Sequence, residues 1–523
     1  MPTSSPLVLT GHPLDFATLD AIGRGALVPV PGKAGLAKAA LAHEVVLESM
    51  AAGRPVYGSN TGVGSLKDRL LSDDDIEAFN TALVRAHNFG TGPFFSAPTV
   101  RKALAIRINT ALTGHSGCSP QLILAFADLF RCGIIPAVRR HGSIGCADIG
   151  LMGQIAAALT GSGEAFYNGM LLPAGEALRQ AGLQPLRLRP RDALAALSTN
   201  AIAFAATSDV LREAARALRV ALATGLLSSL ALGASADPWT VAAELGTRGE
   251  ALAATWLAGQ ATGEGWPAPS GVHDPLSLRM TAQVFGAAVD TLLVAAGRIV
   301  EATHVSDDNP VVIGNRVMAS GASLPLTVAL YVETAQIAFS HVARNILNRC
   351  IQLTNGVRRN LPVNLVAPGV VATGMGPLMK LVVELYMRVQ SLAVPLSAQS
   401  IVVAGGLEEE ATFLPLIVER METQVRDLRQ MAAIEAMLSA QAIDLTGDAP
   451  DGVALLAYER VRATSATYRE DRPLSLEIEA LDRSFSAEDF LAGLIGLAPM
   501  PEFDQCFALS GAMAPVSTGR EAG

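Results

Sequence analysis

Charge is scarce in this sequence of 523 residues, and positive charge is the scarcer sign. Asp, Glu, Lys and Arg make up only 17% of the chain, against about 25% in typical soluble domains. There are 39 Lys and Arg against 48 Asp and Glu, a formal net charge of −9. Nucleic-acid binding needs a basic face, and the basic runs here are no longer than pairs such as Arg139–Arg140. We therefore expect no nucleic-acid partner.

Cysteine is rare too, and the common metal and nucleotide motifs are missing. The five cysteines are scattered and form no C-x-x-C pair, which is typical of reduced thiols in a cytoplasm. None of the eight histidines lies in an H-E-x-x-H pattern, and no P-loop, dinucleotide-binding or G-x-S-x-G motif occurs. We therefore expect a cytoplasmic protein without a metal site, a nucleotide site or a serine nucleophile elbow.

Long unbroken hydrophobic runs are also lacking, although half of the residues are hydrophobic. The apolar segments 360–379, 389–407 and 220–236 are interrupted by proline, glycine or polar side chains, so none offers the ~20 apolar residues of a membrane-spanning helix. Residues 1–13 lack the basic and apolar regions of a signal peptide. A chain this apolar that does not enter a membrane must hide much of its surface, and burial in an oligomer is the natural solution.

The pattern that remains predicts an all-α fold. Alanine and leucine dominate, and apolar residues recur at intervals of three and four. Long helices are expected over 325–353 and 412–445, although Pro415 limits where the second can begin. Segments 201–206 and 292–296 are apolar nearly all round and would lie at the centre of a bundle.

Glycine and proline interrupt the helical pattern at three places. These are the segments 57–64, 141–148 and 306–310, which we interpret as loops. The tail after Pro499 reads as looser, and residues 517–523 are expected to be disordered.

Five polar residues in loops or on apolar helices are candidates for chemistry: Tyr57, His87, Asn200, Arg279 and Glu408. A buried Asn200 amide must find partners, and its structural alternative is to satisfy a neighbouring helix end. Arg279 either pairs with a surface carboxylate or, in an apolar cleft, binds the carboxylate of a substrate with its planar fork.

These pieces resemble one family, the aromatic amino acid lyases, which comprise histidine and phenylalanine ammonia-lyases and tyrosine aminomutases. The resemblance runs from about Leu9 to about Leu445 and preserves the order of the motifs. The matching segments, in chain order, are Tyr57–Gly64 for Y-G-x-N-T-G-F-G, Ala86–His87 for the pocket pair, Gly161–Ala165 after the catalytic loop, Asn200 for the N-G-T asparagine, Asp274–Arg279 for D-P-Y-S-L-R, Ser306–Pro310 for S-D-N-P with one added Asp, and Glu408–Glu410 for E-D-H.

The resemblance implies a long central helical bundle that assembles as a homotetramer, with active sites built from several chains. It implies an N-terminal, loop-bearing portion over 1–200 and a long-helix bundle with C-terminal helices over 201–523. The implied activity is that of an ammonia-lyase or aminomutase acting on an aromatic or imidazole α-amino acid. Tyr57 would take the β-proton, and Glu408 would contact an imidazole or the amino group.

The other implied roles concern the binding of the substrate. Arg279 would bind its carboxylate, Asn200 would orient the carboxylate or the electrophile, and His87 would line the side-chain pocket. Leu276 replaces the tyrosine of D-P-Y-S-L-R, which lies close to the reacting centre in relatives.

The family's electrophile, a methylidene-imidazolone ring, forms from an Ala-Ser-Gly triad within G-S-V-G-A-S-G-D-L, and this chain is one residue shorter there. If Asp148 anchors the alignment, the triad is Gly145-Cys146-Ala147 and Cys146 could lose sulfide instead of water. The Cβ of Ala147 would hinder the closing turn. If Ala147 takes the middle position, no leaving group exists and no ring forms.

Two further hypotheses stay open. The chain could be a family member without the ring that uses Asp148 in acid/base work or the Cys146 thiol, with its pKa lowered at a helix start. It could also bind an amino acid without catalysis. For Cys146 the structural alternative is a small buried hydrophobe.

Overall fold

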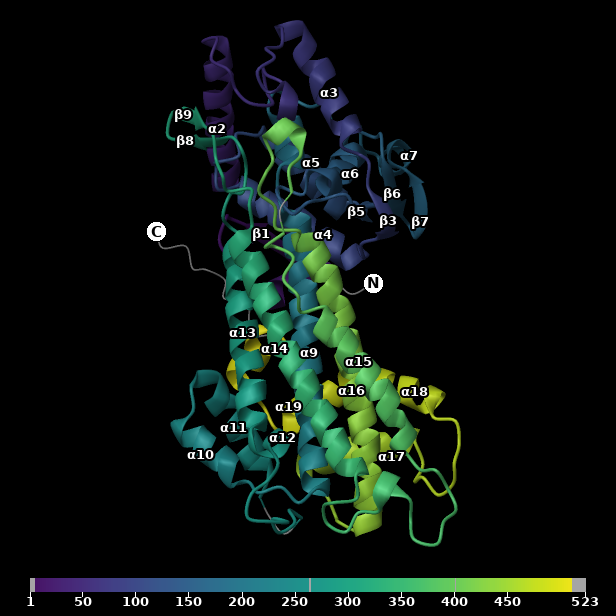
Figure 1. The fold of residues 1–523 in the computed structure, drawn as a ribbon. Coiled ribbons are helices and arrows are strands. Elements are labelled where there is room, and N and C mark those ends of the chain that lie inside the picture. Colours follow the sequence, from purple (N-terminus) through teal and green to yellow (C-terminus); the bar gives the residue numbers. More distant parts are fainter. Residues whose placement is uncertain (1–4, 263–264, 400, 510–523) are drawn as a thin grey trace. The chain divides into compact units, whose positions relative to one another are not determined.

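The computed structural model describes residues 5–262, 265–399 and 401–509, which are mostly helical (Figure 1). The predicted all-α class is confirmed. The chain divides into two compact units: unit 1 takes its residues from 1–209, 297–330 and 395–418, and unit 2 from 210–296, 331–394 and 419–523. The division expected from the sequence is continuous along the chain, whereas unit 1 also holds two later segments. Both are hydrogen-bonded to the N-terminal portion, through Arg107 to Asp308 and through Phe413 to Ile144.

Unit 1 contains the shorter helices of the N-terminal portion. They are α1 (Phe16–Gly23), α2 (Lys33–Ala51), α3 (Ile76–Ala86), α4 (Ala97–Ala111), α5 (Pro120–Arg131), α6 (Ile149–Leu159), α7 (Ala174–Gln180) and α8 (Asp192–Leu197), with 3-10 turns η1 (Gly64–Leu66), η2 (Asp73–Asp75) and η5 (Ala404–Gly406). Side chains at N-caps start several of them: Ser96 accepts from Thr99 before α4, and Ser119 accepts from Leu122 before α5. Each of these caps satisfies a backbone N–H that has no partner inside its helix.

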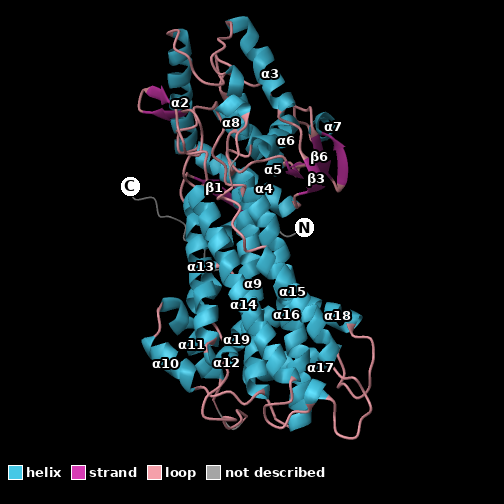
Figure 2. Cartoon of the chain, viewed as in Figure 1, coloured by secondary structure: helices cyan, strands magenta, loops and turns pink. Residues whose placement is uncertain are grey.

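The strands of the described residues all belong to unit 1 and are short (Figure 2). They are β1 (Ser5–Leu9), β2 (Leu27–Pro31), β3 (Thr91–Phe94), β4 (Ile135–Pro136), β5 (Arg139–His141), β6 (Glu164–Tyr167), β7 (Met170–Pro173), β8 (Val311–Ile313) and β9 (Arg316–Met318). β1 and β2 are parallel, while β3–β5, β4–β6–β7 and β8–β9 are antiparallel. The three segments predicted as loops contain no α-helix and join these elements.

The remaining helices belong to unit 2, except that the four longest begin or end in unit 1, where their residues 201–209, 297–302, 326–330 and 414–418 lie. They are α9 (Ala201–Ala231), α10 (Asp237–Leu245), α11 (Arg248–Gln260), α12 (Leu276–Arg279), α13 (Thr281–Ala302), α14 (Leu326–Thr354), α15 (Met379–Ser391), α16 (Leu414–Thr446), α17 (Gly452–Thr464), α18 (Ser475–Phe485), α19 (Glu488–Leu497) and α20 (Pro501–Cys506), with η3 (Val363–Leu365) and η4 (Gly376–Leu378). The long helices are bundled side by side (Figure 1). Glu435 of α16 accepts hydrogen bonds from Ser228 of α9 and from Arg349 of α14.

The two predicted long helices are confirmed as α14 and α16, each displaced by no more than two residues at either end. Residues 201–206 are buried throughout, as expected for the centre of a bundle. Segment 292–296 is a partial exception, because Val294 is 37% exposed.

The expectation of a loose tail is wrong for the residues that directly follow Pro499. They form α20, and Phe503 and Phe507 are fully buried there. Two large aromatic side chains provide enough apolar contact to hold a short helix. The predicted disorder of 517–523 lies outside the described residues.

Two apolar stretches of the described residues, 192–231 and 281–302, have the length of a membrane span. Length and composition are weak evidence, because core helices pass the same test. In the first stretch 94% of the most apolar window is buried inside the protein, which marks a core helix, against 44% in the second.

Candidate active site

The predicted triad lies in the loop between β5 and α6, in unit 1. Gly145, Ala147 and Asp148 all have left-handed backbone conformations, with φ of 74°, 63° and 39°. For a residue with a Cβ this costs on the order of 1 kcal/mol. The loop is held at Ala147, whose N–H donates to the Ser323 carbonyl at 3.0 Å and whose carbonyl accepts from the Thr199 N–H at 3.1 Å.

Gly145 lies directly against the segment that begins α16. A Cβ at this position would come within 2.5 Å of the backbone nitrogens of Phe413 and Leu414 and of Thr412 Oγ1. The Thr412 hydroxyl donates to the Gly145 carbonyl at 2.6 Å. Only glycine fits here, so the triad cannot begin with the alanine of its relatives.

Cys146 is half-buried, with its Sγ 3.6 Å from Ser323 Oγ. Burial raises the pKa of its thiol, and the nearby Glu408 and Asp148 carboxylates raise it further, against a smaller lowering by the Ser323 hydrogen bond. The hypothesis of a lowered thiol pKa at a helix start is therefore wrong, because α6 begins only at Ile149. A protonated thiol is a poor nucleophile.

The electrophilic ring implied by the resemblance does not fit these residues. Ring closure requires the Ala147 nitrogen to attack the Gly145 carbonyl carbon. That nitrogen instead donates to Ser323, and the Gly145 carbonyl accepts from Thr412. The Cβ of Ala147 also stands where the ring-forming sequences have glycine, and the middle residue offers a protonated thiol instead of a hydroxyl.

Asn200 is fully buried between α8 and α9. Its side-chain Nδ2 donates to Asp307 Oδ2 and to the Ser323 carbonyl, both at 3.0 Å. Its backbone carbonyl accepts from the Phe204 N–H in the first turn of α9. Asn200 therefore starts a helix and also reaches the residue that contacts Cys146, so the two interpretations of this amide are compatible.

Asp148 directly follows the triad and precedes α6, and its fully buried carboxylate reaches the first turn of α9. Its carboxylate accepts from the Ser143 hydroxyl at 2.6 Å and from the Ala203 N–H at 3.2 Å. Burial raises its pKa to about 7, more than these hydrogen bonds lower it.

The stability of the protein should therefore depend on pH through Asp148. Its folded-state pKa of about 7 lies above the ordinary value of 3.8, so the folded protein binds the extra proton between these limits. The free energy of unfolding should fall as the pH rises from about 4 to about 7, by on the order of 2 kcal/mol between about pH 5 and 7, and then level off. Urea unfolding across this range should show a weaker decline for Asp148→Asn; parallel curves for the two proteins would refute this assignment.

The Tyr57 loop follows α2 and packs on α8, the helix that precedes Asn200. A Cβ at Gly58 would lie 2.3 Å from Leu194 of α8, and the φ of Gly58 is 64°. Both the close contact and the left-handed backbone therefore require glycine. The half-buried Tyr57 phenol accepts a hydrogen bond from the Gly64 N–H at 3.0 Å. The loop thereby closes on itself and holds the phenol oxygen in place.

Glu408 lies on a small turn that faces the Tyr57 loop. Val403 and Glu408 form an antiparallel bridge around η5, and a Cβ at Gly405 would be 3.3 Å from Oγ of Ser65, a residue of η1. Glu408 is half-buried and acts electrostatically on Cys146, whereas Glu409 and Glu410 are exposed.

His87 caps α3 and is half-buried. Its Nδ1 lies 2.8 Å from the Leu83 carbonyl, which requires a proton on Nδ1 and leaves Nε2 for other contacts. Its backbone carbonyl packs on Gly153 of α6, where a Cβ would approach to 2.2 Å. The ring centroid of Phe89 is 6.3 Å away.

Arg279 and Leu276 lie on α12 and belong to unit 2, whereas the other candidate residues belong to unit 1. Arg279 is half-buried, and its Nε is buried without a hydrogen-bond partner among the described residues. Leu276 is 55% exposed.

A buried polar chain holds the backbone of α12. Asn345 Nδ2 donates to the Ser277 carbonyl at 3.0 Å, and Arg349 donates to Asn345 and pairs with Glu435. Trp239 Nε1 donates to the Leu278 carbonyl at 3.3 Å. These contacts fix the segment that carries Arg279.

Unit 1 therefore brings Cys146, Ala147 and Asn200 together through one residue, Ser323. Ser323 and Thr412 could not be predicted from the sequence, because a single serine or threonine carries no pattern. Asp307 lies within the predicted Ser306–Pro310 match, but nothing in that segment indicated its contact with Asn200.

A family model described as aromatic amino acid lyase matches residues 14–469. A histidine ammonia-lyase of Aromatoleum aromaticum is 31% identical over 450 residues, 84% of this chain and 85% of that protein. A probable histidine ammonia-lyase of Thermoplasma acidophilum is 26% identical over 464 residues, 86% of this chain and 92% of that protein.

Among solved structures, the ergothioneine-degrading ergothionase of Treponema denticola matches with a TM-score of 0.89 and 29% identity, over 93% of this chain and 100% of that one. The tyrosine aminomutase of Streptomyces globisporus has a TM-score of 0.86 at 23% identity, over 94% and 99% of the two chains. The fold is thus that of the ammonia-lyases and aminomutases. The chain belongs to the aromatic amino acid lyase family.

Proposed function

We propose that this protein is a carbon–nitrogen lyase that eliminates an amine from an aromatic or imidazole α-amino acid. The observation that carries the proposal is the grouping of Asn200 and Glu408 around the triad loop in unit 1, beside the loop of Tyr57. In the family resemblance these are the positions of the amide, the acid and the base, whereas Cys146 stands at the position of the electrophile and has no role in this proposal.

In this proposal Tyr57 is the general base that removes the β-proton, and the C–N bond breaks as the double bond forms. Arg279 of another copy of the chain, in an assembly whose active sites are built from several chains, binds the carboxylate with its planar fork. His87, with Nε2 free of the Leu83 contact, lines the side-chain pocket, and Glu408 hydrogen-bonds an imidazole. Leu276 leaves that part of the pocket apolar where relatives have tyrosine.

A site without the ring favours a particular leaving group. A primary ammonium carries N–H protons that a base removes before any C–H proton, and the resulting amine leaves poorly. A quaternary ammonium has no such proton and leaves as a neutral tertiary amine. The misfit of residues 145–147 to the ring therefore favours a substrate whose amine is fully methylated.

One similar protein supports a substrate with a fully methylated amine. The Treponema ergothionase is described as degrading ergothioneine, which is an imidazole betaine with a trimethylated amine. We propose a betaine of this kind as the preferred substrate, with primary amino acids as the alternative.

The five free cysteines, all of them described, suit a cytoplasmic enzyme.

We also propose that the chain assembles as a homotetramer. Large apolar side chains are exposed on the long helices of unit 2: Val294 on α13, Ile337 and Ile351 on α14, Val383 and Met387 on α15. Packing such faces against other copies would remove this surface from water. A monomeric mass from light scattering would contradict the assembly.

The test of function combines an intact mass with a substrate panel. We expect the unmodified chain mass, and release of a conjugated acrylate, read by its ultraviolet absorbance, faster from histidine trimethylbetaine than from histidine, phenylalanine or tyrosine. Cys146→Ala should retain activity, because no ring depends on the thiol. A mass deficit from cyclisation would overturn the proposal of a site without the ring, and no product from any substrate would overturn the lyase assignment.

A further inference from the structure

Two buried acceptor atoms beside the triad have no hydrogen-bond partner among the described residues. They are Asn200 Oδ1 and Asp307 Oδ1, on side chains that are 0% and 5% exposed. Leaving a buried acceptor unpaired costs on the order of 1–3 kcal/mol. Two of them on side chains that are hydrogen-bonded to each other indicate a donor or a cation that the protein itself does not supply.

The orientation of the Asn200 amide follows from its neighbours. Its Nδ2 faces two acceptors, Asp307 Oδ2 and the Ser323 carbonyl, each at 3.0 Å. Turning the amide over would set Oδ1 against both of them, so the NH₂ group must point this way. Asn200 has therefore no donor left for a substrate carboxylate, and the group it offers is an acceptor.

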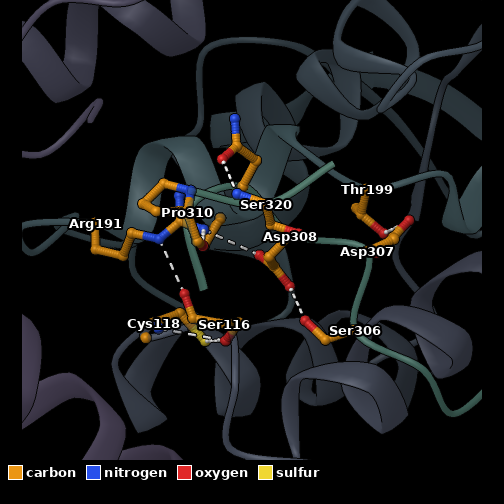
Figure 3. Close-up of polar contacts among 12 residues, drawn as sticks. Ser116, Cys118, Arg191, Thr199, Ser306, Asp307, Asp308, Pro310 and Ser320 are labelled. Atoms are coloured by element: carbon orange, nitrogen blue, oxygen red, sulfur yellow. Dashed lines mark hydrogen bonds and ion pairs between the residues drawn. The ribbon is translucent and has the colours of Figure 1, made fainter. Parts of the chain in front are cut away.

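Asp307 is held in turn by the start of α9. Its Oδ2 also accepts from the Asn200 N–H at 2.5 Å and from Thr199 Oγ1 at 3.2 Å. The neighbouring Asp308 carboxylate is directed elsewhere, toward Arg191 and Ser306 (Figure 3). Asp307 thus makes no hydrogen bond to a guanidinium in the described chain, although Asp308 makes three.

The charged groups around the neighbouring Cys146 are acidic, while Asp307 is acted on both by Asp308 and by Arg107. Ser323 links this amide to Cys146, since its carbonyl accepts from Asn200 and its hydroxyl lies 3.6 Å from Sγ. The charged groups that act on Cys146 are the carboxylates of Glu408 and Asp148. A cationic group is therefore favoured on this side of the site, and a carboxylate is disfavoured.

We propose that Asn200 and Asp307 form a subsite for the cationic amine of the substrate, in which Asp307 is a positioning residue that fixes Asn200 as an acceptor. This rests on the proposed function. The amine is recognised here by charge and by acceptor atoms, in place of covalent capture on an electrophile. An ammonium would donate hydrogen bonds to the two oxygens. In a trimethylammonium the positive charge is spread over the methyl groups, and these would contact the same two oxygens.

Asp307→Asn tests this subsite. The amide has the shape of the acid, but it removes the charge and brings an NH₂ that can pair with Asn200 Oδ1. Calorimetry would compare histidine and its trimethylbetaine with imidazole-4-propionate, which has the same ring and carboxylate but no amine. We expect Asp307→Asn to weaken the two cationic ligands by roughly 10- to 100-fold and to leave imidazole-4-propionate within about threefold.

Thr199→Val is the matched control, because it removes one hydrogen bond to Asp307 and keeps the charge. It should leave all three affinities within about threefold. Asp307→Ser keeps the comparison possible if the amide variant does not fold. Equal losses for ligands with and without the amine, or no loss at all, would overturn the subsite.

The wild-type protein separates this inference from the proposed function. If it prefers the cationic ligands to imidazole-4-propionate but releases no acrylate, the subsite stands and the lyase proposal fails. If it releases acrylate but binds all three with one affinity, the subsite fails and the lyase proposal stands.

Discussion

Replacing Tyr57 by phenylalanine should lower kcat/KM for amine elimination by roughly 10²- to 10⁴-fold, the range for loss of a general base. The phenol oxygen is the only group that the substitution removes, and the loop around it has other supports. Asn60 Oδ1 accepts from the Val56 N–H at 2.7 Å, and the Gly62 N–H donates to the Arg69 carbonyl at 2.9 Å. The loss should therefore appear in kcat, measured by the absorbance of the product, with little change in the affinity for imidazole-4-propionate.

Tyr167→Phe is the matched control for this experiment. Tyr167 is another half-buried tyrosine of unit 1, on β6, and its pairing in the sheet is through the backbone. It should keep the wild-type rate. A Tyr57→Phe protein within tenfold of wild type would show that the proton goes to another base, for which Glu408 is the next candidate.

Replacing Asp308 by alanine should destabilise unit 1 by about 3–5 kcal/mol, enough to lose much of the folded protein. Arg107 donates to both carboxylate oxygens at 2.9 Å, and Arg191 adds a third contact at 3.2 Å. Both guanidiniums are at least 99% buried, so they would lose their common counter-charge without gaining water. Figure 3 shows Arg191 also reaching Ser116, which ties distant segments to this carboxylate.

Urea unfolding measures this effect, with Asp128→Ala as the control. Asp128 pairs with Arg131 at 2.8 Å, but both side chains are exposed, by 43% and 62%. A pair of this kind contributes about 1 kcal/mol or less. If the two variants lose equal stability, burial does not explain how much the Asp308 network contributes to the free energy of unfolding.

The long helices could be predicted because their causes are local. Segments 325–353 and 412–445 carry apolar residues at helical spacing and no internal glycine, and they appear as α14 and α16. The loops at 57–64 and 141–148 could be predicted for the same kind of reason, since glycine clusters stop helices wherever they occur. The C-terminal α20 was missed, because what holds it is the burial of Phe503 and Phe507.

The surroundings of the triad could not be predicted in this way. Thr412 and Ser323 touch residues 145–147 from positions more than 170 residues away, and neither stands in a recognisable motif. The sign of the shift at Cys146 was wrong for a related reason. A pKa depends on burial and on neighbouring charges, and both are properties of the folded chain.

The sequence by itself determined the helical class, the positions of the loops and the membership of the aromatic amino acid lyase family, because periodicity and ordered motifs are written along the chain. The tertiary structure alone decided which atoms meet. It turned the Asn200 amide toward Asp307 and Ser323, directed Asp308 to two buried arginines, and placed Thr412 against Gly145. Hydrogen bonds and charges act over a few ångströms of space, whatever the separation of their residues in the chain.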